Sequence, residues 1–161
     1  MVGHGNVNMK KPKSGYRLYI LMRNDLPSMN AGRKMAHAAH AANQFTFSCG
    51  KKSNVKRWQN DANGFGTTIC VSVNREQLQK IVLEAFNRNV LAGCVYDPEY
   101  SYVLHPEIAT LIDRRTFTED VIIKEDGQWV LFRNELTCGY LFVADDSTDR
   151  QDLVGELPLH P

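Results

Sequence analysis

Short apolar runs alternate along the first two thirds of the chain with longer segments whose apolar positions recur at helical spacing. The run at 16–23 (YRLYILMR) lacks helix breakers and is typical of a strand buried on both faces. Segment 31–47 is rich in alanine and predicts a helix whose small side chains can approach a sheet closely. Such alternation is typical of an α/β domain with a parallel or mixed sheet and right-handed crossovers. The same patterns predict strands at 67–73 and 90–96 and helices at 51–61 and 75–87.

Beyond Pro98 the pattern changes. The pair Asp126-Gly127 stands between the alternating runs 121–124 and 129–132, which is a strong signal for a β-hairpin. We expect this region, at about 102–136, to be an insertion into an otherwise compact domain. The remaining predicted elements are a short helix at 106–114, a strand at 140–143 and a short helix at 149–154.

The length of 161 residues and the 43% share of hydrophobic residues suit one globular domain. We expect this domain to span 16–161 and to follow a disordered basic leader at 1–15. No run approaches the roughly 18 apolar residues of a membrane span, and the start lacks the apolar segment of a secretory signal. The four cysteines show no spacing typical of a zinc or redox pair, so we expect reduced thiols and a cytoplasmic protein.

The net charge of +1 conceals a strong asymmetry. Residues 1–57 hold eleven Lys and Arg against a single acid, Asp25, whereas the rest of the chain carries eight basic and seventeen acidic residues. Clustered cations displace counterions from nucleic acid, so this excess predicts a phosphate-bearing partner. The alternative interpretation is a flexible basic tail followed by a solvated helix face.

Polar residues also gather where the predicted strands end. Ligands of open α/β sheets collect at the carboxyl ends of the parallel strands, and Asp97 follows the strand at 90–96. A carboxylate that faces cations beside free helix N–H groups can orient water and hold phosphate. Taken alone, an aspartate at a strand end is more often a turn or cap residue than a base. The residues expected at the same edge are Arg23, Asn24, Asp25, Asn30, Gly32, Arg33 and Lys34.

Other kinds of site find less support in the sequence. His37 and His40 lie three positions apart on one helix face, but a zinc site needs three or more ligands and no other His or Cys has matching spacing. We therefore predict no metal. The chain also lacks a nucleophile-elbow motif, a phosphate-binding P-loop and a dinucleotide glycine fingerprint, which argues against covalent serine catalysis and nucleotide hydrolysis.

The segment Arg23-Asn24-Asp25-Leu26, followed by MNAGRKMAHAAHAA at 29–42, resembles the signature of the type-2 peptidyl-tRNA hydrolases of archaea and eukaryotes. Weaker similarities are Trp58, Asp97, the pair Thr137 and Gly139, and GELPL at 155–159. The resemblance implies a three-layer α/β sandwich in which a mixed, mainly four-stranded sheet lies between helices. The predicted hairpin at 102–136 interrupts the matching regions.

The resemblance also implies an activity, namely metal- and cofactor-independent hydrolysis of the ester between peptide and tRNA. Asp97 matches the family's aspartate and would orient or deprotonate water. Arg33 stands at the family's lysine position, with Lys34 beside it, while Ser101 and Thr137 stand at its two threonine positions; these groups would stabilise the oxyanion. His37 replaces the family's glutamine. The residues expected to contact tRNA are Arg23, Asn24, Asp25, Lys34, His37, Lys51 and Lys52.

Arg33, His37 and Ser101 depart from the family's residue types, which leaves a second hypothesis open. The chain would then bind tRNA, or another phosphate ligand, without turnover. A third hypothesis is an interaction module whose inserted hairpin recruits a protein partner. The sequence also leaves open a homodimer.

Overall fold

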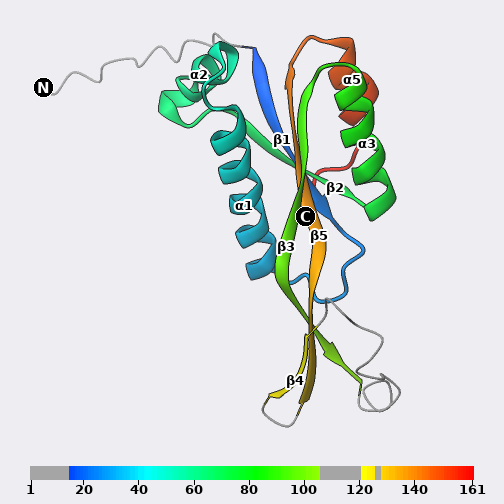
Figure 1. The fold of residues 1–161 in the computed structure, drawn as a ribbon. Helices are drawn as coiled ribbons and strands as arrows, with labels where there is room; N and C mark the ends of the chain where they lie inside the picture. Colours follow the sequence, from blue (N-terminus) through cyan, green and yellow to red (C-terminus); the bar gives the residue numbers. More distant parts are fainter. Residues whose placement is uncertain (1–14, 106–120, 126–127) are drawn as a thin grey trace, which may run out of the picture.

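A computed structural model describes residues 15–105, 121–125 and 128–161. Its five strands form one sheet in the order β2-β1-β5-β3, with β4 paired to β5 beyond this path (Figure 1). Because β1 is parallel to β2 whereas β5 is antiparallel to β1 and β3, the sheet is mixed. The strands are β1 (Tyr16–Arg23), β2 (Thr68–Val73), β3 (Leu91–Leu104), β4 (Val121–Glu125) and β5 (Gln128–Ala144). The helices are α1 (Ala31–Cys49), α2 (Ser53–Gln59), the 3-10 turn η1 (Ala62–Gly64), α3 (Arg75–Asn87) and α5 (Thr148–Val154).

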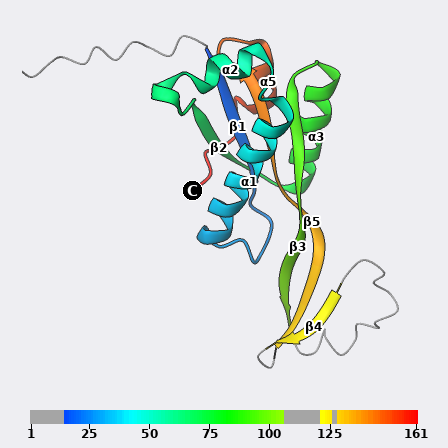
Figure 2. The same cartoon turned by 60° about the vertical axis from the view of Figure 1, so that its left-hand side comes forward.

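Helices cover both faces of the sheet, so the predicted three-layer α/β class is confirmed (Figures 1 and 2). On one face, Leu18, Ile20 and Met22 of β1 pack with the residues of α1 and α2. On the other face, Tyr19 and Leu21 pack with α3 and α5. Because both faces are buried, β1 is a continuous apolar and aromatic run from Leu18 to Met22 and shows no alternation, as the sequence predicts.

Local signals place the helix starts. Asn30 caps α1, its side chain accepting a hydrogen bond from the Arg33 N–H at 3.0 Å. Asn74 and Gln77 form a reciprocal capping box at the start of α3. The predicted helices at 31–47 and 75–87 are therefore confirmed, with α1 two residues longer. Within the described part of the chain, no helix is long and apolar enough to cross a membrane.

The two longest strands depart from the prediction. The strand expected to end at Tyr96 continues to Leu104, and the separate strands expected at 129–132 and 140–143 are parts of the continuous strand β5. Together with β4, the outer halves of β3 and β5 form an arm that projects from the domain (Figure 2). The prediction was wrong because Asp97-Pro98 was interpreted as a strand end. The ladder instead shifts register between Val95 and Tyr96 and between Asp97 and Tyr100, and such bulges accommodate proline.

The hairpin predicted around Asp126-Gly127 is supported by its flanks, because β4 pairs antiparallel with β5 and Glu125 lies opposite Gln128. Residues 126–127 themselves, the predicted helix at 106–114 and most of the predicted leader lie outside the described residues.

The last residues of the chain cover the free edge of β2. Leu159 forms an antiparallel bridge with Val71. The Ser72 N–H donates to the Pro158 carbonyl at 2.9 Å, and the His160 N–H donates to the Cys70 carbonyl at 3.0 Å. This segment, 157–160, therefore occupies hydrogen-bonding positions that an edge strand would otherwise expose.

Candidate functional site

A cavity of about 240 Å³ lies between the first turns of α1 and the part of β3 that contains the second bulge. Four of the predicted site residues meet there: Arg33 and His37 from α1, and Asp97 and Ser101 from β3. The remaining lining residues are Ala36, His40, Glu99 and Tyr100. The helix and the strand thus bring the four predicted site residues together although 60 or more positions separate the two pairs in the sequence.

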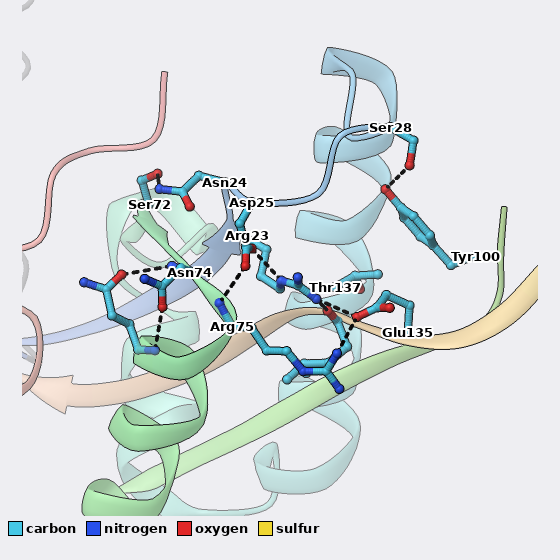
Figure 3. Close-up of polar contacts among 12 residues, drawn as sticks. Arg23, Asn24, Asp25, Ser28, Ser72, Asn74, Arg75, Tyr100, Glu135 and Thr137 are labelled. Atoms are coloured by element: carbon cyan, nitrogen blue, oxygen red, sulfur yellow. Dashed lines mark hydrogen bonds and ion pairs between the residues drawn. The ribbon is translucent and has the colours of Figure 1, made fainter. Parts of the chain in front are cut away.

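Arg33 joins α1 to β3. Its Nη2 donates to the Ser101 Oγ at 2.6 Å and its Nη1 donates to the Ser101 carbonyl at 3.0 Å. The guanidinium carbon lies 5.0 Å from the centre of the Tyr100 ring, within the range of a cation–π contact. The Ser28 hydroxyl in turn hydrogen-bonds the Tyr100 hydroxyl at 2.9 Å, which places that ring (Figure 3). The cationic group at the site is therefore held in one orientation by neighbours on two sides.

His37 and Asp97 face each other across the cavity. The His37 Nε2 lies 3.8 Å from the Asp97 Oδ2, too far for a direct hydrogen bond and close enough for one water to contact both. The other carboxylate oxygen, Oδ1, accepts the Glu99 N–H at 3.0 Å, which fixes the orientation of the carboxylate. Asp97 thus has one oxygen engaged by the backbone and the other directed toward His37.

The His37 imidazole is 3% exposed. Burial lowers its pKa below the ordinary value, against the opposing effect of the Asp97 carboxylate, while His40 and Arg33 lower it further. The lowered pKa favours the neutral form of the ring, which can accept a proton. The ring's Nδ1 is buried and has no hydrogen-bond partner.

Thr137 lies outside this cavity. Its side chain is fully buried, and its hydroxyl donates to the Val95 carbonyl at 3.4 Å. The ladder pairs Val95 with Cys138 and Tyr96 with Leu136, so Thr137 is the extra residue of a bulge in β5. Of the four predicted catalytic residues, the structure thus brings Arg33, Asp97 and Ser101 together at the cavity. Thr137 is buried in β5, outside the cavity.

The predicted tRNA-binding residues are spread over a wide area. His37 lines the cavity, whereas the half-buried Lys34 is not among the lining residues. Lys51 and Lys52 are exposed just after α1. At 1.5 Å rise per residue they lie about 27 Å from Arg33 along the helix axis. The exposed Asn24 donates to the Ser72 Oγ at 3.0 Å (Figure 3).

Arg23 is 5% exposed and is used within the fold. Its Nη1 contacts the buried Glu135 carboxylate and the Leu136 carbonyl, each at 2.6 Å, and its Nε donates to Asp25 at 2.7 Å (Figure 3). Arg75 approaches the same Glu135 oxygen at 3.4 Å. The sequence predicts a phosphate contact for Arg23, whereas in the structure this guanidinium is buried and paired with two carboxylates, so it does not face solvent.

Sequence reasoning missed Tyr100, Tyr102 and Glu135. The Tyr102 hydroxyl donates to the second Glu135 oxygen at 2.9 Å, and the carboxylate raises the pKa of this phenol together with burial, which is the larger cause. The signal that could have revealed the two tyrosines is the alternation in Tyr100-Ser101-Tyr102-Val103, which is typical of a strand. No local pattern marks Glu135, because its partner Arg23 lies 112 residues away.

The described residues contain no group of three or more His, Cys, Asp or Glu side chains placed to hold a metal ion. A larger hollow, of about 460 Å³, lies between α3 and the segment from α5 to Leu157, on the opposite layer from His37 and Asp97. Its mixed polar and apolar lining includes none of the predicted site residues. The α1–β3 cavity is thus where a carboxylate, a neutral imidazole, a guanidinium and a hydroxyl converge, which is a set able to activate water and stabilise an oxyanion.

The chain matches a family of known proteins. The family model described as peptidyl-tRNA hydrolase PTH2 matches residues 16–123, which is more than half of the chain. A solved structure of a protein of unknown function from Agrobacterium tumefaciens strain C58 is 14% identical, with a TM-score of 0.46. That alignment covers 91% of this chain and 98% of the other. Among curated proteins, none matches the sequence significantly.

Proposed function

Because the chain belongs to the peptidyl-tRNA hydrolase PTH2 family, we propose that it hydrolyses the ester bond between a peptide and the terminal ribose of tRNA. The observation that carries this proposal is the convergence of Arg33, His37, Asp97 and Ser101 on one cavity. Ester hydrolysis needs an activated water and donors for the oxyanion, and these four groups include both kinds.

Asp97 and His37 activate the water. A molecule placed between the Asp97 Oδ2 and the His37 Nε2 hydrogen-bonds the carboxylate and points its second proton at the imidazole. As the water oxygen bonds to the ester carbon, His37 accepts that proton, and the adjacent carboxylate stabilises the resulting imidazolium. His37 then returns the proton to the ribose oxygen when the carbon–oxygen bond breaks, which yields a free peptide and a free tRNA hydroxyl. This role requires the tautomer with its proton on Nδ1.

Arg33 and Ser101 stabilise the negative charge on the carbonyl oxygen. The Ser101 Oγ accepts a hydrogen bond from Arg33, so its own proton is available to donate to the oxyanion. The guanidinium adds a fixed positive charge, and donors that are oriented before the reaction need no rearrangement in the transition state. Thr137 supports the site indirectly in this proposal, by fixing the bulge that precedes Asp97.

Cations of the first third of the chain hold the tRNA through its phosphates. Lys34, Lys51 and Lys52 belong to this set, while Arg23 is withdrawn from it by its buried ion pairs. A second candidate function, tRNA binding without turnover, is favoured by the engagement of Arg33 with Ser101, because a guanidinium already bonded twice has fewer free donors for an oxyanion.

Release of tRNA from N-acetylaminoacyl-tRNA tests both functions. We expect turnover by the wild-type protein, and a loss of about 10²–10⁴-fold in kcat for Asp97→Ala, the range for a general acid–base group. Glu99→Gln is the control, because it alters a neighbouring carboxylate that lines the same cavity. Salt-sensitive tRNA binding with no hydrolysis would reject the hydrolase function and support the second candidate function, tRNA binding without turnover.

A further inference from the structure

The outer edge of β3 is open. In the sheet order β2-β1-β5-β3 this strand is the last, and across the described ranges only β5 pairs with it. The edge segment 91–96 reads Leu-Ala-Gly-Cys-Val-Tyr, without a charge or a proline. Proteins normally protect such edges with charges, prolines or a covering segment, and segment 157–160 gives β2 that protection. The contrast marks segment 91–96 as an edge left free to pair.

The backbone groups at this edge can be assigned. The Val95 carbonyl accepts a hydrogen bond from Thr137 on β5, so it points into the sheet. Antiparallel ladders alternate, so the N–H and carbonyl groups of Ala92 and Cys94 point outward. The Gln44 side chain, reaching over from α1, donates to the Cys94 carbonyl at 3.4 Å. The outward Cys94 carbonyl is therefore accessible to a hydrogen-bond donor from outside the sheet.

The edge is also sterically accessible. Gly93 is required because a Cβ at this position would lie 2.7 Å from atoms of the Tyr140 ring. Residues 91–94 are all partly exposed, and Tyr96 is 49% exposed. This partial exposure leaves the edge accessible to a second backbone.

The open edge leads directly into the α1–β3 cavity, because Asp97 follows Tyr96. At about 240 Å³ the cavity is smaller than the roughly 300–1,000 Å³ of typical ligand pockets, so it accommodates the reacting ester and little of the peptide. A peptide with its carboxyl carbon beside Asp97 must leave the cavity along a neighbouring surface. Since β3 runs from Leu91 toward Asp97, such a peptide would run parallel to it. Six residues of strand provide about 20 Å of edge.

Building on the proposed hydrolase function, we propose that the peptide part of the substrate adds to β3 as an extra parallel strand along 91–96. Recognition then comes from main-chain hydrogen bonds, which every peptide sequence can make except at proline. The substrate class is thus an extended peptidyl ester of tRNA in which several residues before the ester contribute to binding, with little dependence on their side chains.

Substrates of graded length test this inference with the unmodified protein. Peptidyl-tRNAs that carry one, three or five residues should show KM falling by about tenfold or more with length, equally for alanine-rich and serine-rich peptides. The amides of the five-residue peptide form two alternating sets, and only one set can face β3 because successive residues of a strand point in opposite directions. N-methylation of that set should abolish the decrease in KM, whereas N-methylation of the other set should leave it unchanged. Equal KM values for one and five residues, or equal effects of both methylated sets, would overturn the proposal.

The variant Cys94→Pro removes one outward N–H while leaving the ladder with β5 intact. Its KM should no longer fall with peptide length, whereas Cys94→Ala, which keeps the backbone N–H, should retain the length dependence. A dimer in sedimentation experiments that dissociates on Cys94→Pro would show that a second copy occupies the edge instead. If N-acetylaminoacyl-tRNA is hydrolysed but the longer peptides bring no gain, only this inference fails. If no substrate is hydrolysed, the proposed function fails and this inference falls with it.

Discussion

Arg33 forms two hydrogen bonds to Ser101, one to its hydroxyl at 2.6 Å and one to its carbonyl at 3.0 Å. This bidentate contact ties the start of α1 to β3 at the base of the projecting arm. The type-2 peptidyl-tRNA hydrolases that the sequence resembles carry lysine at this position. A single ammonium group lacks the planar fork that reaches both oxygens in a fixed orientation.

Arg33→Ala should lower kcat by about 10²–10³-fold, the range measured when one oxyanion donor is removed. Arg33→Lys keeps the positive charge that stabilises the oxyanion and should retain much of the activity. Steady-state kinetics with N-acetylaminoacyl-tRNA measures both variants. A wild-type kcat in Arg33→Ala would remove this residue from the catalytic set.

The proton acceptor role of His37 predicts a specific pH profile. Because burial lowers the pKa of the imidazole below its ordinary 6.5, the decline of kcat/KM on the acid side should have its midpoint below pH 6.5. His37→Gln, which introduces the family's residue, should remove this acid limb. If His37→Gln shows the same decline of kcat/KM at acid pH as the wild type, the decline reflects the titration of another group.

The same pKa shift predicts how stability depends on pH. Below 6.5 the unfolded chain protonates His37 while the folded protein does not, so the unfolded state binds more protons. The free energy of unfolding therefore decreases as the pH is lowered from 6.5 to the pKa of His37 in the folded protein. Urea unfolding at pH 7.5 and at pH 5.5 should show a smaller difference for His37→Gln than for the wild type.

The buried pair of Arg23 and Glu135 predicts a non-additive mutant cycle. Glu135→Leu leaves the Arg23 charge buried with one carboxylate partner fewer, and Arg23→Met leaves Glu135 without its closest cation. Each should destabilise the fold by about 3–5 kcal/mol, whereas the double variant should lose less than the sum. Chemical denaturation at pH 7 provides the four free energies. Additive losses would contradict direct coupling.

Phosphate contacts predict salt dependence. Replacing Lys51 and Lys52 by alanine should reduce the slope of log K against log salt for tRNA binding by about 0.7–0.9 per lost contact. Lys80→Ala provides the matched control, since this exposed lysine belongs to α3 on the opposite layer and pairs with Glu84. An equal reduction by the control would show that the effect reflects net charge alone.

The sequence allowed the core elements to be predicted because their signals are local. The apolar run of β1 and the Asn30 and Asn74 caps all act within a few residues. Asp97 and Ser101 could be paired with Arg33 only through the family resemblance, since nothing local links a helix start to a strand 60 residues later. The lengths of β3 and β5 could not be predicted, because a bulge absorbs Asp97-Pro98, the same signal that usually ends a strand.

Burial was the other quantity that the pattern did not reveal. Thr137 and Arg23 look like accessible polar groups in the linear sequence, yet both are enclosed by partners distant along the chain. The pairing of β4 with β5 supports the predicted β-hairpin, and the prediction that 102–136 is an insertion stays a prediction. The continuity of β5 with the central sheet depends on pairing between segments that no local rule connects. A protein partner for this arm stays a prediction, as does a homodimer.

Segment 157–160 covers the β2 edge of the sheet, whereas the β3 edge is open. A sheet with two open edges could join molecules edge to edge into an open-ended fibre, because each added molecule would expose another unpaired edge strand. With β2 covered, two copies that pair through their β3 edges leave no further β3 edge, so their association ends at a dimer. The β3 edge can therefore stay available to a peptide strand without copies of this chain polymerising through both edges of the sheet.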